Sequence, residues 1–182
     1  MIFEETRLKD VHIVKLETLA DKRGFFARSW CKKEFSDKGL VNDFVQNNVS
    51  FNKNKGTLRG MHYQEEPFGE VKIVRCVRGS IYDVVIDLRK HSDTYKQWMG
   101  AELNEDNRNM LYIPNGFAHG FLTLEDNTEV LYQMSEYYQP EAARGVRFND
   151  PAFNIEWPLN GKPLISEKDN NWPNFKEQAT YL

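Results

Sequence analysis

The stretch Val71–Leu88, VKIVRCVRGSIYDVVIDL, decides the fold of this chain. Its two halves, Val71–Arg78 and Ile81–Leu88, are rich in valine and isoleucine, which favour extended structure. Between them, Gly79-Ser80 suits a two-residue turn, with glycine at the position that needs a positive φ. The stretch therefore predicts a hairpin of two antiparallel strands.

The rest of the chain repeats this pattern of short β-branched and aromatic runs between glycines and asparagines. Only one helix is clear, at Lys32–Lys38, which Gly39 can end in the left-handed conformation. Strands so numerous and short would leave exposed edges in an open sheet, so we expect an all-β double-sheet jelly roll with a few short helices. Further strands are expected at His12–Leu16, Gly24–Trp30, Phe44–Phe51, Gln97–Leu103, Met110–Ile113, Gly120–Leu124 and Glu129–Ser135.

Length and charge limit the possibilities further. The chain has 182 residues, enough for one well-filled core, and we expect a single domain over residues 1–182. The segment from Pro158 onward is expected to be an irregular tail on that domain. A formal net charge of −3 provides no basic field, so nucleic acid is not an expected partner.

The cysteines and the N-terminus bear on the compartment. Cys31 and Cys76 share no close spacing and predict neither a disulfide framework nor a metal site. The segment Met1–Thr6 lacks the basic and apolar regions of a signal peptide, and no apolar run has the length that crosses a bilayer. We therefore expect a cytoplasmic protein that does not associate with a membrane.

A first candidate for chemistry lies in Gly56–Gln64, GTLRGMHYQ, which resembles a buried strand. Side chains alternate across a strand, so Arg59 is expected on one face and His62 on the other, where Gly60 leaves room for a ligand. An imidazole in such a place can move a proton near neutral pH. The alternative is a core histidine hydrogen-bonded to the backbone.

A second candidate is the segment Tyr112–Phe121, whose Pro-x-Gly-x-x-His spacing resembles the second cupin motif. The strand after its tight turn is expected to carry His119 inward. Metal-binding cupins supply His-x-His and a glutamate from a first motif, but here Gln64 stands where the second histidine would follow His62. An amide is a poor ligand for a transition metal, so we expect no metal.

The ordered motifs of the whole chain resemble those of the dTDP-4-dehydrorhamnose 3,5-epimerase family. The matching blocks are Arg23-Gly24-Phe25-Phe26, Gln46-Asn47-Asn48-x-Ser50, Leu58-Arg59-Gly60-x-His62-Tyr63-Gln64, Lys72-x-Val74, Asp83–Arg89, Ile113-Pro114-x-Gly116–Phe121, Asn149-Asp150-Pro151 with Trp157-Pro158, and Ser166-Glu167-Lys168-Asp169. The resemblance implies a cupin-fold homodimer, an isomerase without metal or cofactor, that acts on nucleotide-linked 4-keto-6-deoxy sugars.

The resemblance also implies catalytic roles. In a 4-keto sugar the carbonyl acidifies the C–H bonds at C3 and C5, so epimerisation needs a base, a group that stabilises the enolate and an acid. His62 matches the base, Asp169 its carboxylate partner, Lys72 the group facing the oxyanion and Tyr132 the proton donor. Without the resemblance, Lys72 would be a strand lysine facing solvent and Tyr132 a buried tyrosine with a satisfied hydroxyl.

Substrate-binding roles follow in the same way. The expected set is Arg23, Arg59 and Lys168 for the diphosphate and nearby sugar, Gln46, Asn47 and Asn48 for hydroxyls or the base, Phe26 and Tyr138 around the nucleotide, and His119 beside the sugar. Asp83 and Asp87 lie four positions apart near Arg89 and are expected to form a structural ion-pair network. For Asp83, orienting a pocket histidine is the one further role expected.

Three segments depart from the family pattern. Arg28 stands where the family has a glutamate that helps hold the nucleotide, Ala142-Ala143 replace an expected acidic contact, and Phe68-Gly69-Glu70 replaces a proline-glutamine-glycine turn. The leading hypothesis is conversion of dTDP-4-dehydro-6-deoxy-D-glucose to dTDP-4-dehydro-L-rhamnose. The alternatives are a 3- or 5-mono-epimerase acting on another 4-keto-6-deoxy nucleotide sugar, for example a CDP-linked one, a non-catalytic sugar-binding cupin, and a metal-dependent cupin.

Overall fold

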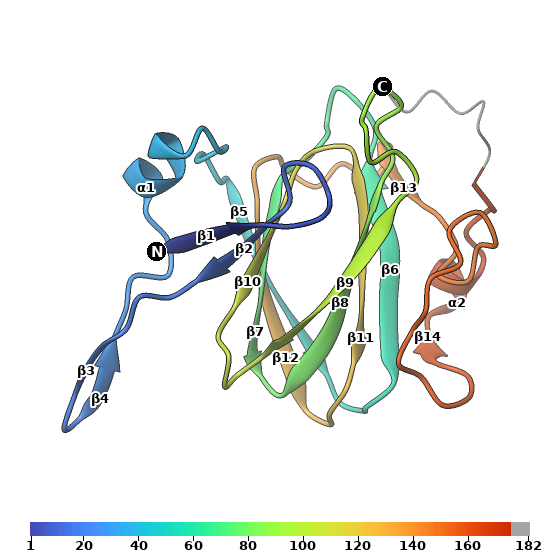
Figure 1. Cartoon of the computed structure of the whole chain (residues 1–182). Helices are drawn as coiled ribbons and strands as arrows, with labels where there is room; N and C mark the ends of the chain where they lie inside the picture. The colour runs from blue at the N-terminus through green and yellow to red at the C-terminus, as the bar shows by residue number, and fades with distance from the viewer. Residues whose placement is uncertain (176–182) are drawn as a thin grey trace.

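The computed structural model describes residues 1–175, and nearly all its regular structure is strand (Figure 1). The elements in chain order are β1 (Ile2–Glu5), β2 (His12–Lys15), β3 (Leu19–Asp21), β4 (Gly24–Phe26), α1 (Lys32–Asp37), β5 (Gln46–Asn52), β6 (Thr57–Gln64), β7 (Lys72–Arg78), β8 (Ser80–Asp87), β9 (Trp98–Asn104), β10 (Met110–Ile113), β11 (Phe117–Thr123), β12 (Thr128–Met134), β13 (Ala143–Gly145), β14 (Leu164–Ile165) and α2 (Glu167–Asn170).

Two six-stranded sheets face each other and form the predicted jelly roll. The first sheet has the order β1-β2-β10-β7-β12-β5, and the second has the order β13-β6-β11-β8-β9 with β14 added parallel to β6. The other pairs within these two sheets are antiparallel. The all-β prediction is confirmed, as are α1 and the left-handed Gly39, which has φ of 69°.

The predicted hairpin at Gly79-Ser80 is wrong. Gly79 does take a positive φ of 73°, but β7 pairs with β10 and β12, whereas β8 pairs with β9 and β11. The chain therefore crosses from one sheet to the other at this turn. A Cβ atom on Gly79 would lie 2.6 Å from Oγ1 of Thr128, so the crossing also needs a residue without a side chain.

The core has three layers because each sheet is covered on both faces. The residues between the sheets include Val74, Val85, Leu111 and Val130, all fully buried. The outer face of the first sheet packs against α1 through Phe35. The outer face of the second sheet is covered by the C-terminal segment, including Val146, Phe153 and Trp157.

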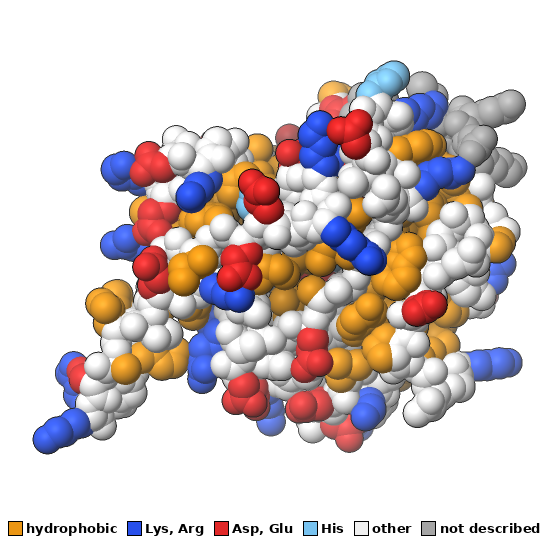
Figure 2. All heavy atoms as spheres, viewed as in Figure 1, with side chains coloured by type: hydrophobic (Ala, Val, Ile, Leu, Met, Phe, Trp, Pro, Cys, Tyr) orange, Lys and Arg blue, Asp and Glu red, His pale blue; other side chains and the backbone are white. Residues whose placement is uncertain are grey.

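The two-stranded β3–β4 sheet projects away from the roll as an arm (Figure 1). The strand predicted at Gly24–Trp30 ends at Phe26, because β3 offers only three residues for pairing. Leu19 and Phe26 on this arm are each 71% exposed. Figure 2 shows hydrophobic side chains along the arm and a positive charge at its tip. No helix in the described part of the chain is long and apolar enough to span a membrane.

Candidate active site

A register shift between β6 and β11 places the central residues of the site. His62 is opposite His119 and Arg59 is opposite Phe121, so three residue steps on β6 match two on β11. Such a bulge changes which side chains share a face. Arg59 and His62 both line the cavity, while Met61 packs in the outer hydrophobic cluster. The prediction that Arg59 and His62 face opposite ways is therefore wrong.

Gly60 also has a different role from the one expected. A Cβ atom on Gly60 would lie 2.5 Å from the Cα of Gly120 on β11. The absent side chain thus makes room for the neighbouring strand and not for a ligand. Its φ of 135° is a further reason for glycine at this position.

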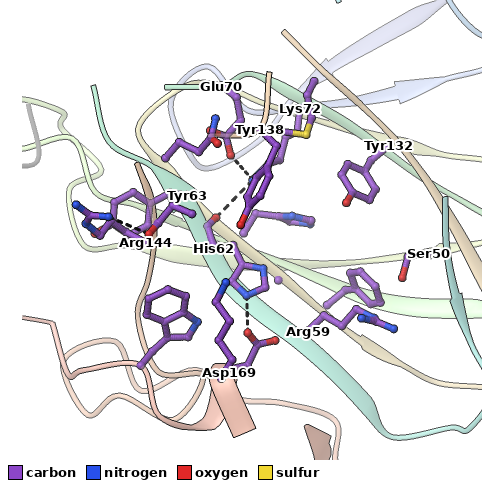
Figure 3. A pocket seen from close by; sticks show the side chains of 18 of the residues that line it. Ser50, Arg59, His62, Tyr63, Glu70, Lys72, Tyr132, Tyr138, Arg144 and Asp169 are labelled. Carbon is purple, nitrogen blue, oxygen red and sulfur yellow. Dashed lines mark hydrogen bonds and ion pairs between the residues drawn. The ribbon is translucent and has the colours of Figure 1, made fainter. Parts of the chain in front are cut away.

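The cavity has a volume of about 440 Å³. Figure 3 shows it from close by. Both sheets and α2 contribute to its wall. The predicted site residues that the structure brings together here are His62, Lys72, Tyr132, Asp169, Arg59, His119, Tyr138 and Lys168.

His62 and Asp169 form a hydrogen-bonded pair although 107 residues separate them in the sequence. The distance from Nε2 of His62 to Oδ1 of Asp169 is 2.7 Å, and Oδ2 accepts a hydrogen bond from the Gly60 N–H at 3.3 Å. Asp169 lies in α2, whose N-terminus is capped by the Ser166 hydroxyl. Burial raises the pKa of Asp169. Its contacts with His62, the Gly60 N–H and the Trp172 side chain lower the pKa by more than burial raises it, so the net pKa is below the ordinary value.

Lys72 enters the cavity from the opposite sheet. Its Nζ lies 2.7 Å from Oε1 of Glu70 and 3.5 Å from the carbonyl oxygen of His62, to which it donates (Figure 3). The lysine side chain is only 9% exposed and that of Glu70 only 4%. The expectation from strand propensity alone, a solvent-facing lysine, does not hold.

Tyr132 lies on β12 of the same sheet as Lys72 and faces the cavity from the side opposite β6 (Figure 3). Burial raises the pKa of its phenol; the positive charge of Arg59 lowers it and the negative charge of Glu70 raises it, and the net shift is upward. The phenol therefore keeps its proton at neutral pH. The imidazole and the phenol therefore line the cavity from opposite sheets.

A second histidine–carboxylate pair lies beside the first. Nε2 of His119 is 2.7 Å from Oδ1 of the fully buried Asp83, which confirms that Asp83 orients a pocket histidine. The predicted ion-pair network at Asp87 is also confirmed: Arg89 contacts it at 2.8 Å. Burial raises the pKa of Asp87, while hydrogen bonds from Arg89 and neighbouring hydroxyls lower it to a net value below the ordinary one.

Five predicted binding residues do not line the cavity of their own chain. Arg23 and Phe26 lie on the arm, where Arg23 pairs with Asp21. Gln46 and Asn48 lie on β5 behind Met134, with Asn48 Nδ2 3.3 Å from its sulfur atom. Asn47 lies on the same strand, is exposed and does not line the cavity.

Other residues at the cavity were not singled out for it. Glu70 appeared only within an unusual turn, and Trp172 lies three positions after Asp169 in a segment expected to be irregular. The Trp172 ring lies 6.2 Å from that of His62 in an edge-to-face arrangement and 5.6 Å from Nζ of Lys168. Arg144 pairs with Glu65 at 2.8 Å at the cavity wall. Their proximity to matched motif residues is the only sequence signal that could have found them.

Arg28 does not reach the cavity. Its guanidinium lies 2.6 Å from Glu34 in α1, which also binds the N-terminal ammonium. Within residues 1–175, no group of three or more histidine, cysteine, aspartate or glutamate side chains is arranged to hold a metal ion.

A jelly roll with a carboxylate-paired imidazole, a buried ammonium and a half-buried phenol around one cavity defines an acid–base enzyme of the cupin fold. The family model for dTDP-4-dehydrorhamnose 3,5-epimerase matches residues 5–177. An enzyme of that name from Methanothermobacter thermautotrophicus is 44% identical, over 99% of this chain and 97% of its own.

Solved structures agree. The dTDP-4-dehydrorhamnose 3,5-epimerase from Bacillus anthracis, with TDP and PPi bound, has a TM-score of 0.92 and 41% identity over 96% of this chain and 99% of its own. The epimerase from Legionella pneumophila, in complex with dTDP-4-keto-L-rhamnose, has a TM-score of 0.87 and 33% identity over 96% and 98%. The chain belongs to the dTDP-4-dehydrorhamnose 3,5-epimerase family, and the isomerase class and cupin fold predicted from its sequence are confirmed.

Proposed function

We propose that this enzyme converts dTDP-4-dehydro-6-deoxy-D-glucose to dTDP-4-dehydro-L-rhamnose by inverting C3 and C5. The observation that carries the proposal is the placement of His62 and Tyr132 on opposite sheets around one cavity. Inversion removes a proton from one face of a carbon and returns one to the other face. A base and an acid on opposite walls meet that requirement.

His62 is the proposed base. If its Nε2–H donates to Asp169, Nδ1 carries the lone pair that takes the C–H proton. The carboxylate then stabilises the imidazolium that forms. Asp169 is suited to this because its lowered pKa keeps it ionised at neutral pH.

Lys72 and Tyr132 complete the proposed reaction. The Lys72 ammonium stabilises the enolate oxygen, and a fixed charge in a buried site has more effect than one in water. The Tyr132 phenol returns a proton to the opposite face and is held protonated by its raised pKa. Arg59 and Lys168, together with Arg144, are the cations of the cavity wall available to a diphosphate.

We further propose that the enzyme works as a homodimer in which each arm completes the site of the other copy. The arm carries Arg23 and Phe26, which match nucleotide-binding positions, and exposes large apolar side chains. On the first sheet, the edge strand β5 likewise exposes Val49 and Phe51. Exposed apolar residues at a sheet edge favour pairing with a second copy.

Mixing two inactive variants tests the dimer. His62→Ala lacks the base, and Arg23→Glu lacks the proposed phosphate contact. After subunit exchange, the mixture should regain about one quarter of wild-type activity, because half of the dimers would be mixed and each would hold one complete site. No recovery from a mixture shown to contain mixed dimers, or a monomeric mass by light scattering, would contradict the proposal.

We place the enzyme in the cytoplasm, since both cysteines are unpaired, as suits a reducing compartment.

The substrate is tested by proton NMR in deuterated water, with the 4-keto-6-deoxyglucose offered as its dTDP form and as its CDP form. We expect deuterium at both C3 and C5 with the dTDP form. Exchange at one carbon, or with the CDP form alone, would support the mono-epimerase alternative. A His62→Ala variant should show no exchange and serves as the blank.

A further inference from the structure

Glu70 forms a buried ion pair with the lysine of the proposed reaction. It precedes β7 by two residues, and its Oε1 lies 2.7 Å from the Lys72 Nζ. Both side chains line the cavity and are more than nine-tenths buried. Burying polar groups is costly unless they are hydrogen-bonded, and each of these two side chains supplies a hydrogen-bond partner for the other.

The hydrogen bonds of the Lys72 ammonium fix the direction of its third N–H group. An ammonium has three N–H groups. In the described part of the chain, two of them have acceptors, Oε1 of Glu70 and the backbone carbonyl of His62. Two fixed acceptors set the rotation of the ammonium about its Cε–Nζ bond, so the third N–H has a set direction. One of these acceptors is the backbone carbonyl of His62, whose imidazole is the proposed base.

We propose that Glu70 is a positioning residue that holds the Lys72 ammonium so that its third N–H meets the enolate oxygen. The inference rests on the proposed function, in which Lys72 stabilises that oxygen. Glu70 itself does not contact the reacting atoms in this proposal. Its effect on the rate is therefore expected to pass entirely through Lys72.

Only one oxygen of Glu70 is needed for this role. The other, Oε2, is buried and has no hydrogen-bond partner among residues 1–175. In Glu70→Gln the amide oxygen can take the place of Oε1, and the amide nitrogen the place of Oε2, where it displaces no contact. Glu70→Asp does the reverse, because it keeps the charge but withdraws the oxygen by one methylene.

These two variants separate geometry from charge. Glu70→Asp is expected to lower kcat about tenfold to a hundredfold, because a misplaced donor loses most of its effect on the transition state. Its KM and its affinity for dTDP, measured by calorimetry, should change less than about twofold, since the nucleotide is held elsewhere. Glu70→Gln should keep kcat within about threefold of wild type. Glu66→Asp, on the exposed part of the same loop, is the matched control and should leave kcat unchanged.

A double-mutant cycle with Lys72→Met then tests whether Glu70 acts through Lys72. If it does, Glu70→Asp should cause no further loss of C–H exchange in the Lys72→Met enzyme. Three results would each overturn this inference and leave the proposed role of Lys72 intact. They are a wild-type kcat in Glu70→Asp, equal losses of kcat in the Asp and Gln variants, and additive losses in the double-mutant cycle. Wild-type exchange by Lys72→Met would instead overturn the proposed role of Lys72, and this inference with it.

Discussion

Replacing Asp169 by asparagine tests the proposed base most directly. The substitution keeps the size of the side chain but removes the charge 2.7 Å from the imidazole. An amide can also present its N–H to Nε2 of His62. That would reverse the tautomer and leave Nδ1 protonated, unable to accept the substrate proton.

The expected loss can be worked from the geometry. Charge centres about 4 Å apart attract by about 4 kcal/mol at an effective dielectric constant of about 20. The His62 side chain is 42% exposed, so solvent screening reduces this to about 2 kcal/mol. That corresponds to about a 30-fold loss of rate. The reversed tautomer adds to it, since the same substitution in a serine protease triad costs about 10⁴-fold.

The assay is the rate of deuterium incorporation at C3 and C5, followed by proton NMR at saturating substrate. Asp169→Asn is expected to lose at least about 30-fold in kcat, with little change in the affinity for dTDP. Asp87→Asn is the matched control, because Asp87 is buried in the Arg89 network and does not line the cavity. A loss of less than about threefold in folded Asp169→Asn would refute the assignment of His62 and Asp169 as the base pair.

Three further predictions concern single groups of the site. Because the pKa of Asp169 is lowered on folding, its pairing with His62 stabilises the fold at neutral pH and stops doing so once the pH falls below the folded-state pKa. The difference in Tm between wild type and Asp169→Asn should therefore be present at pH 7 and shrink as the pH is lowered through the acidic range. Tyr132→Phe should still exchange the abstracted proton but give no inverted product, and full inversion in the NMR assay would show that another group is the donor. Trp172→Phe should lower kcat/KM about threefold to tenfold, because it alters the ring contact with His62. Trp30→Phe, in the cluster around α1, is the control and should leave kcat/KM unchanged. Equal kcat/KM values for the two variants would exclude a role for the Trp172 indole.

The strands could be predicted from the sequence because local residue patterns specify them. The pairing of those strands into two sheets could not be predicted. Val71–Leu88 shows the difference: both strands and the glycine turn are as expected, yet the strands lie in different sheets. Alternation and turn residues specify extended backbone and a reversal of direction. Which strand becomes the neighbour depends on contacts with β10, β11 and β12, which are distant in sequence.

The same limit explains what was missed in the site. The resemblance matched His62 to Asp169 through motifs, and the two residues meet across 107 positions as expected. The position of Arg59 beside His62 could not be obtained from alternation, because the extra residue on β6 exists only relative to β11. The Glu70–Lys72 pair likewise forms only when the loop before β7 folds against the cavity.

The distribution of the matched residues suggests how the site is divided. The four residues matched to catalytic roles meet around one cavity within a single chain. Arg23 and Phe26, matched to the nucleotide, lie on an arm that makes no wall of that cavity and that exposes its apolar side chains. One chain therefore brings the residues of the proposed chemistry together, whereas Arg23 and Phe26, the residues proposed for the nucleotide, lie outside its cavity. An arm from a second copy would supply the missing contacts, so substrate binding and dimer formation would depend on the same interface.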